Sequence, residues 1–184
     1  MPYSHPITSS GLYVTITAAD KTSVPDINKT LDELDKIADG KVYQLFDADK
    51  ITDHRHIHYA AANAYHALET GNNISNTLNV ETLLYASTQD QIYKAIKAIG
   101  VSQKTRRIAI LVISDTVNDE LAKQIAHHLG TLDDNLLRLT PEKFDALKQF
   151  YGITETALNT INGDEYQALT SLITEKGALI SLKR

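Results

Sequence analysis

Residues 106–114, RRIAILVIS, constrain the fold more than any other segment. From Ile108 to Ile113 every side chain is apolar and most are β-branched, which is typical of a strand. A strand without polar alternation is buried on both of its faces. The segment therefore predicts a sheet with other elements packed on both sides.

Strand and helix patterns alternate around this segment. Further strands are predicted at 12–17 and 42–46. Residues 178–182 are interpreted as either a last edge strand or a helical end, and we favour the strand. The helices that we predict span 27–39, 53–70, 79–99, 117–129, 141–151, 154–161 and 164–175. Ser23 is the expected cap of the first helix and Asp53 the cap of the second. The fold class is α/β (α+β), a single domain over 1–184 with a small mixed sheet of about four strands surrounded by many helices.

The helix predicted at 79–99 contains five consecutive polar residues, Ser87 to Gln91, which we call the polar belt. Five residues sweep more than one helical turn, so one of them must point toward the core. Thr88 falls in the inward stripe, and a threonine hydroxyl can bond back to a carbonyl one turn earlier. We therefore expect the helix to continue through the polar belt.

Composition excludes several classes of site. The 184 residues contain no cysteine, which rules out disulfides, thiolate metal sites and cysteine nucleophiles and fits a reducing cytoplasm. The eight glycines stand far apart and form no phosphate-binding loop, so independent nucleotide hydrolysis is not expected. The apolar runs are too short for a membrane span, and the first ten residues lack the pattern of a signal peptide.

The segment 53–66, DHRHIHYAAANAYH, places His54 and His58 one helical turn apart, a spacing that could seat a metal ion. A third ligand is not obvious, and the HExxH pattern is absent. A metal-dependent hydrolase is therefore an alternative to the simpler interpretation, a solvated or partner-facing helix flank. We assign no metal and no cofactor.

Charge is distributed unevenly along the chain, whose net charge is −5. Five acidic residues crowd the first predicted helix, which indicates a solvated face or the binding surface of a basic partner. From Gln91 to Ser114 there is no acidic residue. This basic block contains Lys94, Lys97, Lys104, Arg106 and Arg107. The block indicates either a solvated helix end and turn or a surface that contacts phosphates.

Residues 71–101, GNNISNTLNVETLLYASTQDQIYKAIKAIGV, resemble the signature segment of a KEOPS subunit family. Its eukaryotic member is called PRPK-binding protein, and archaea carry the family as well. The shared features are N-I-S before a helix, an acidic residue, L-L-Y-A-S, a Q-I pair, A-I and a glycine. They stand here at 73–75, 81, 83–87, 91–92, 95–96 and 100. The order and length of the following strand and helices also fit.

The resemblance implies a non-catalytic subunit of the complex that installs threonylcarbamoyl on a tRNA adenosine. Such a subunit binds and activates the small kinase-like ATPase of the complex and captures the single-stranded 3′ CCA end of tRNA. The implied partners are that ATPase and tRNA, without a membrane or a small-molecule substrate. The apolar surface for the ATPase is expected among the helices of the C-terminal half.

Single strands are held by cations at their phosphates and by aromatic and amide side chains at their bases. Tyr85 and Tyr93 lie in or beside the polar belt, and each is interpreted either as a base-stacking ring or as a packing residue. The residues assigned to RNA binding are Asn73, Ser75, Asn79, Tyr85, Gln91, Lys94, Lys97, Arg106 and Arg107.

Two positions depart from the family pattern. Asp90 stands where the family usually has arginine, and Asn72 stands where it often has arginine or lysine. Both changes remove positive charge from the segment assigned to RNA. They favour an alternative function, a protein–protein adaptor that binds the ATPase without binding RNA.

Overall fold

The computed structural model describes residues 1–8 and 10–183. Five strands form one sheet in the order β1-β2-β4-β3, with β5 paired to β2. Their bounds are β1 Tyr3–Pro6, β2 Tyr13–Asp20, β3 Val42–Asp47, β4 Ile108–Ser114 and β5 Thr131–Leu132. The described pairs are all antiparallel, where a mixed sheet of about four strands was predicted. The predicted α/β class is confirmed, and β1 and β5 are strands that the sequence pattern missed.

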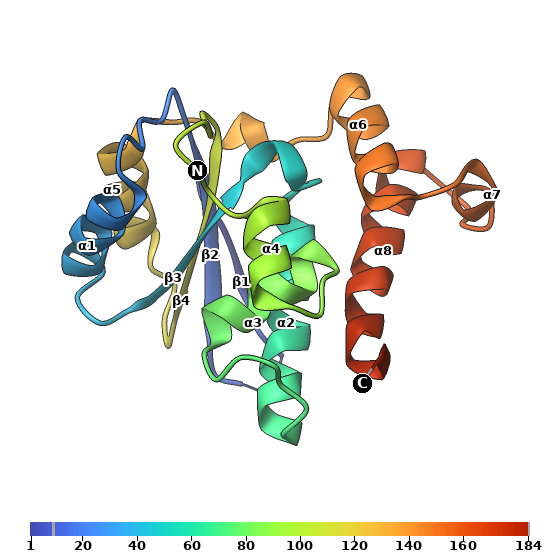
Figure 1. Cartoon of the computed structure of the whole chain (residues 1–184), viewed down its shortest axis with the longest axis horizontal. Coiled ribbons are helices and arrows are strands. Elements are labelled where there is room, and N and C mark those ends of the chain that lie inside the picture. Colours follow the sequence, from blue (N-terminus) through green and yellow to red (C-terminus); the bar gives the residue numbers. More distant parts are fainter. Residues whose placement is uncertain (9, 184) are drawn as a thin grey trace.

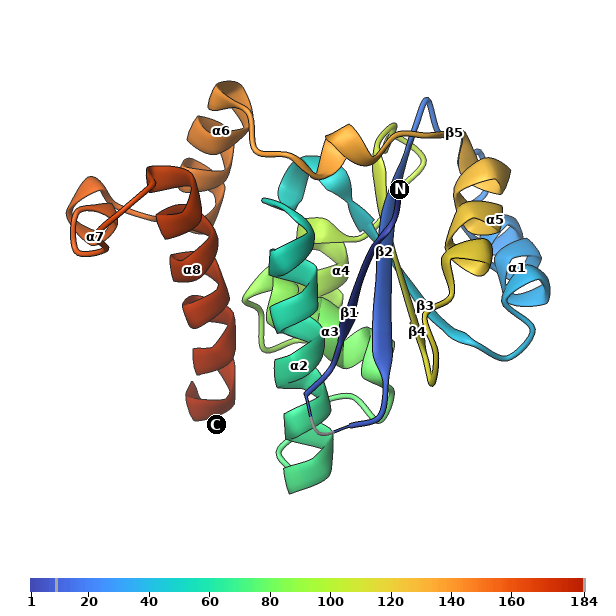
Figure 2. The same cartoon turned by 180° about the vertical axis from the view of Figure 1, so that it is seen from behind.

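Helices cover both faces of the sheet (Figures 1 and 2). One face carries α1 (Ile27–Ala38) and α5 (Asp119–Leu129), and the other carries α2 (His54–Thr70), α3 (Leu78–Ser87) and α4 (Ile92–Ile99). All seven residues of β4 are buried, as predicted. Residues alternate along β4 between the two cores, because successive side chains of a strand point to opposite faces.

The C-terminal helices form a third layer outside α2 (Figure 1). They are α6 (Pro141–Tyr151), α7 (Glu155–Leu158) and α8 (Glu165–Ala178), with 3-10 turns at Ala48–Lys50 (η1), Asp134–Leu137 (η2) and Leu179–Lys183 (η3). The edge strand predicted at 178–182 is wrong, because this segment continues α8 and then forms η3. Ile180 is fully buried in the core beneath α2 and α3, so packing onto helices replaces pairing with a sheet.

The caps agree with expectation for α2 and differ for α1. The carboxylate of Asp53 accepts the backbone N–H groups of Arg55 and His56, which confirms it as the α2 cap. Asp26, rather than Ser23, caps α1 by accepting from two backbone N–H groups of its first turn. Asp26 lies three residues closer to the first helical hydrogen bond, so its carboxylate reaches the unpaired N–H groups.

The helix predicted at 79–99 is broken within the polar belt. Thr88 has a left-handed backbone with φ of 58°, and its N–H donates to the end of α3. A new helix, α4, then begins after Gln91. The reason is burial: α3 is enclosed on nearly every side from Glu81 onward, whereas α4 buries only the stripe of Ala95 and Ile99. Two helices with different directions satisfy these two environments, which one straight helix could not.

Within residues 1–8 and 10–183, every helix falls short of the length and apolar content that crossing a membrane would need.

Candidate functional site

The N-I-S segment is held onto α3 by a buried carboxylate. Glu81 is fully buried and accepts hydrogen bonds from the backbone N–H groups of Ile74 and Ser75, at 3.0 and 2.7 Å from Oε2. The Ser75 hydroxyl accepts the N–H of Thr77, and the Asn73 amide donates to the Ser75 carbonyl. The signature residues Asn73, Ser75 and Glu81 therefore shape this loop. Ser75 is itself buried, so its hydroxyl is turned away from any RNA on the surface.

Tyr85 is not a surface ring. Its side chain is 4% exposed and belongs to the core beneath α2 and α3. The prediction that it stacks on a base is therefore wrong in this structure, because enclosure of α3 leaves no room for a base. Tyr93, on α4, is 66% exposed and is the tyrosine of the signature segment that solvent reaches. The sequence alone left both tyrosines open to either interpretation.

The cations of the basic block remain at the surface. Lys94 and Lys97 project from α4, and Lys104 and Arg106 from the loop that connects α4 to β4. We call these four residues the basic strip. Among the described residues none of the four forms an ion pair. Arg107 differs, since its Nε lies 3.3 Å from Oδ1 of Asp49. Gln91, at the start of α4, is also exposed.

An apolar groove of about 660 Å³ lies between α1 and α4. We call it the α1–α4 groove; β3 and α3 complete it, and Figure 1 shows the four elements side by side. Its walls include Leu31, Val42, Val80, Leu83, Ile96 and Val101. Ile96 is 52% exposed, which is unusual for isoleucine and leaves an apolar face of α4 without a covering element. Cavities of this size and character are typical of ligand sites.

Polar groups lie at the α1 and β3 side of this groove. The Tyr43 hydroxyl donates to Oδ1 of Asp35 at 2.8 Å, and burial together with Asp35 raises the pKa of Tyr43. Asn79 lines the groove, and its amide donates to the Tyr43 carbonyl at 3.3 Å. The predicted RNA residue Asn79 thus lies in the groove, next to the exposed face of α4. No local sequence pattern indicates the groove, because four separate elements build it.

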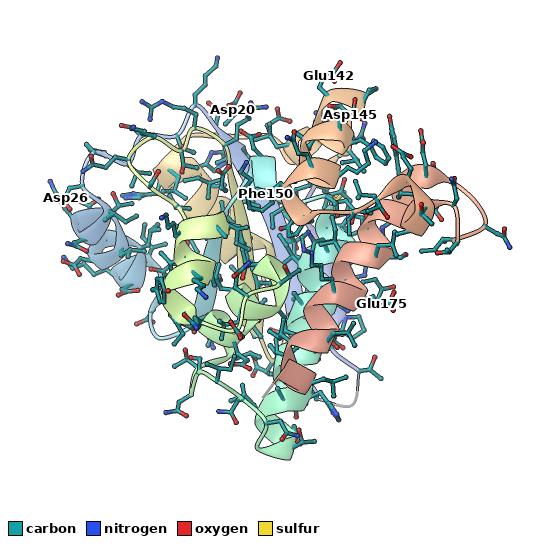
Figure 3. The ribbon with its side chains drawn as sticks, turned by 45° about the vertical axis from the view of Figure 1, so that its right-hand side comes forward. Asp20, Asp26, Glu142, Asp145, Phe150 and Glu175 are labelled. Atoms are coloured by element: carbon teal, nitrogen blue, oxygen red, sulfur yellow. The ribbon has the colours of Figure 1, made fainter. Side chains whose placement is uncertain are left out.

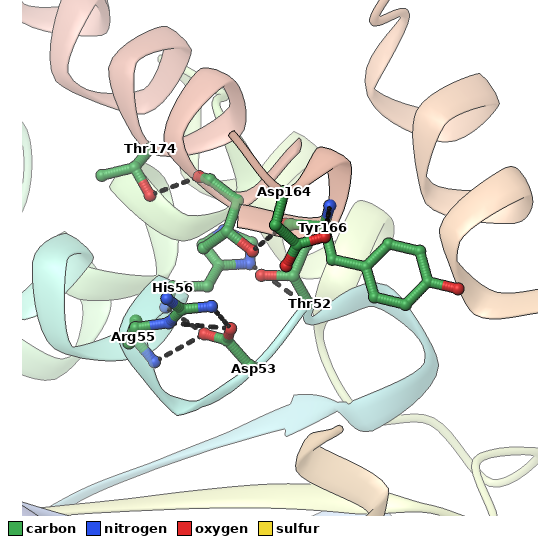
Figure 4. Close-up of polar contacts among 8 residues, drawn as sticks. Thr52, Asp53, Arg55, His56, Asp164, Tyr166 and Thr174 are labelled. Atoms are coloured by element: carbon green, nitrogen blue, oxygen red, sulfur yellow. Dashed lines mark hydrogen bonds and ion pairs between the residues drawn. The ribbon is translucent and has the colours of Figure 1, made fainter. Parts of the chain in front are cut away.

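A second, more polar cavity of about 380 Å³ lies between α2 and α8. Arg55 lines it, but the guanidinium is engaged by Asp53, with Nε 3.0 Å from Oδ2 (Figure 4). Glu175 contributes a further negative charge to the lining. Because its one cation is already neutralised, this cavity is a weaker site for a phosphate than the basic strip.

Two of the α2 histidines, His54 and His58, pack against β1. The ring of His54 stacks on Tyr3 with centroids 4.0 Å apart, and His58 stacks on His5 at 4.9 Å. Nε2 of His58 lies 3.1 Å from the carbonyl oxygen of Pro6. Burial lowers the pKa of His54 and of His58, so burial favours the neutral form of both rings. In the part of the chain that the structure describes, no three histidine or acidic side chains converge on a metal-sized site.

Exposed apolar side chains also occur in the C-terminal third. Phe150, near the end of α6, is 40% exposed, and Lys50 lies over its ring at 4.5 Å (Figure 3). Leu179 and Leu182 are exposed beyond α8. Asp26 and Glu142, both labelled in Figure 3, lie at the periphery of the molecule.

Residues 21–181 match the family model described as kinase binding protein CGI-121. The chain belongs to this family. The CGI-121 match spans both faces of the sheet, the groove, the basic strip and the C-terminal helices. It agrees with the KEOPS-subunit resemblance of the signature segment, because both point to a kinase-binding regulatory protein.

A named relative supports the same assignment. The chain is 25% identical to the regulatory protein Cgi121 of Methanocaldococcus jannaschii over 145 residues, which is 79% of this chain and 87% of that protein. The family is thus named for binding a kinase, and this relative is named a regulatory protein. Of the sequence-assigned residues, the structure places Asn79 in the groove and Gln91, Lys94 and Lys97 on or at the start of α4, leaves Arg106 and Arg107 exposed before β4, and encloses Ser75 and Tyr85.

Proposed function

We propose that this CGI-121 protein is a non-catalytic subunit of a KEOPS-type tRNA threonylcarbamoyladenosine complex in the cytoplasm. It binds and activates the small kinase-like ATPase of the complex and captures the 3′ CCA end of tRNA. Family membership supports the kinase partner. The RNA role goes beyond the family description and rests on the surface of α4 and the loop that follows it.

The observation that carries the RNA role is the exposed basic strip. Its four cations are free of ion pairs within the described chain, although acidic residues outnumber basic ones, 23 to 18. An unpaired cation breaks no ion pair of the protein when it binds a phosphate, and each such contact releases counterions from the nucleic acid. Tyr93 adds an exposed aromatic ring beside Lys94, whose Nζ lies 6.0 Å from the ring centroid. Cations next to an open aromatic ring are the usual elements of single-strand binding.

A second candidate is an adaptor that binds the kinase without RNA. Asn72 and Asp90 are both exposed, so the charge differences from the family pattern occur at the surface, where they would weaken phosphate binding. Arg107 is already paired with Asp49. The two candidates share the kinase partner and differ only in their affinity for tRNA.

Binding of intact tRNA and of tRNA trimmed of its 3′ CCA separates these candidates. We expect Lys94→Glu with Arg106→Glu to weaken binding of intact tRNA at least tenfold, because two attractive contacts become repulsive. The matched control is Lys29→Glu with Lys123→Glu, which makes the same charge change on α1 and α5. Fluorescence anisotropy at fixed salt measures the affinities.

Equal affinity of the wild-type protein for intact and trimmed tRNA would reject CCA capture. An unchanged tRNA affinity in the double charge reversal would favour the adaptor. Co-purification with the kinase-like ATPase encoded in the same genome, with and without tRNA, tests the shared part of the proposal.

A further inference from the structure

The connection between α7 and α8 contains an asparagine followed by a glycine, Asn162 and Gly163. Each other asparagine of the chain is followed by a residue that has a side chain. Both residues of the pair are exposed and lie between the two helices rather than within them. The pair follows Ile161, which packs on the apolar cluster of α6 to α8, and precedes Asp164, the cap of α8. Figure 1 shows α7 at the outer edge of the C-terminal layer, so solvent reaches this connection.

The two groups that could react with each other are not held by hydrogen bonds. Within residues 1–8 and 10–183, neither the Asn162 amide nor the Gly163 backbone N–H has a hydrogen-bond partner. Other asparagines differ in this respect. The side-chain oxygen of Asn118 accepts the N–H of Leu121, and the amide of Asn79 donates to a carbonyl of β3. The side chain of Asn162 is therefore free to turn toward the nitrogen that follows it.

Gly163 leaves space for that approach. Its backbone has φ of 125°, a conformation open to glycine and rarely taken by other residues. A Cβ at this position would meet nothing within 4 Å, so no neighbouring segment closes the connection. The nitrogen of Gly163 and the side-chain carbonyl carbon of Asn162 can close a five-membered ring. A glutamine in place of Asn162 would require a six-membered ring, which forms less readily.

We propose that Asn162 is a site of spontaneous deamidation in the folded protein, with water as the co-reactant. The Gly163 nitrogen forms a bond to Cγ of Asn162, and the bond from Cγ to Nδ2 breaks. The proton of the Gly163 N–H passes through water to the departing nitrogen, which leaves as ammonia. Water then opens the cyclic imide. Cleavage at Cγ gives aspartate, and cleavage at the main-chain carbonyl carbon gives isoaspartate, whose backbone runs through Cβ and Cγ.

Both products change the start of α8. Each adds a carboxylate two residues before Asp164, where Glu165 already contributes a further negative charge. Isoaspartate also lengthens the main chain by one carbon between Ile161, which is packed on the helices, and the cap of α8. Its free main-chain carboxylate is the group that repair methyltransferases esterify with S-adenosylmethionine. The site is independent of the proposed function, because its chemistry needs neither RNA nor the kinase.

Peptide mass spectrometry of the full chain after incubation in mildly alkaline buffer tests this inference. Digestion at mildly acidic pH avoids new deamidation, and fragmentation separates a change at 162 from one at 159. We expect the deamidation mass increase at 162 first, together with methyl label from S-adenosylmethionine and an L-isoaspartyl methyltransferase. Asn162→Gln and Gly163→Ala should each lose most of the label. The matched control is Asn159→Gln, an exposed asparagine of the same connection that precedes threonine, and it should keep the label.

A parallel incubation in urea separates the fold from the sequence pair. We expect similar rates of change at 162 in the folded and the unfolded chain, because the fold imposes no hydrogen bond or steric barrier there. Conversion in urea without conversion in the folded protein would show that the fold protects Asn162, and would overturn the inference. Faster conversion of another asparagine in the folded protein, or full labelling of Asn162→Gln, would also overturn it.

Discussion

One carbonyl, that of Ala86, joins three helices through two buried side chains. His56 of α2 has Nε2 at 3.0 Å from this oxygen, and the Tyr151 hydroxyl of α6 donates to it at 3.2 Å. The backbone N–H of Thr52 donates to Nδ1 of His56 at 3.4 Å, so Nε2 carries the proton and the ring is neutral (Figure 4). Burial is the main reason that the pKa of His56 falls to about 4.

This histidine makes stability depend on pH. Its pKa is lower in the folded chain than the ordinary 6.5, so the unfolded chain binds the proton more readily between about pH 6.5 and 4. We expect the unfolding free energy to be highest above pH 6.5 and to fall by about 3 kcal/mol as the pH drops to 4. Urea denaturation at several pH values measures this fall.

His56→Gln serves as the variant for this prediction, since its amide can still donate to the Ala86 carbonyl. The pH dependence should become shallower, without vanishing, because burial also lowers the pKa of His54 and His58. A pH dependence as steep as that of the wild-type protein would assign the effect to other groups.

At the scale of elements, α8 packs closely on α3 through a glycine. A Cβ at Gly177 would overlap the backbone carbonyl oxygen of Tyr85 and would lie 3.3 Å from the carbonyl carbon, which is a tight contact. The close approach brings α8 onto the enclosed helix and lets Ile180 reach the core. The favoured strand at 178–182 began directly after this glycine, because a contact between distant segments leaves no local pattern.

Gly177→Ala should lower the unfolding free energy by about 1–3 kcal/mol, even though alanine favours helices more than glycine does. The overlap with Tyr85 backbone cannot be relieved by a side-chain rotation, so α8 must shift. Thermal and urea unfolding measure the loss, and Ser171→Ala on the exposed face of α8 is the control. A stability gain in Gly177→Ala would show that propensity outweighs the contact.

Local patterns predicted most elements, including the buried strand β4 and the α2 cap Asp53. The errors arose where burial decided the outcome. Thr88 adopts a left-handed backbone that a β-branched residue rarely takes, because α3 and α4 pack in different surroundings. Enclosure of Tyr85 has the same origin. The cations of the site could be predicted from the sequence, because the segment from Gln91 to Ser114 contains no acidic residue. The groove could not be predicted, because it forms only when α1, β3, α3 and α4 come together in the folded chain.

For the whole molecule, the layered architecture places the acid-rich helix and the lysine-bearing helix α4 on opposite faces of the sheet, although Asp35 and Ile96 line one groove where the two helices approach at the β3 edge. The acid-rich helix α1 lies on the opposite face of the sheet from α4 and its lysines (Figure 2). A protein with a negative net charge can thereby keep one basic surface that binds a polyanion. The acidic remainder of its surface repels nucleic acid and so limits non-specific binding. Phosphate contacts on such a surface predict a marked dependence of tRNA affinity on salt.

The logarithm of the tRNA association constant should fall linearly with the logarithm of salt concentration. Lys97→Gln should reduce the magnitude of the slope by about 0.7, the contribution of one phosphate contact on a single strand. Arg107→Gln should reduce it by less, because Arg107 is partly neutralised by Asp49. Titrations at four or more salt concentrations measure the slopes, and equal slopes for all three proteins would remove Lys97 from the interface.

The amide side chains of Gln44 and Asn79 have a consequence for crowded solutions. An edge strand with free carbonyls invites copies of the same chain to pair with it and to grow into ordered aggregates. Here two carbonyls of β3 are already engaged, so self-association along this edge is discouraged within the folded protein. The protein can thus leave an apolar surface beside its sheet open to solvent without that surface seeding fibrils.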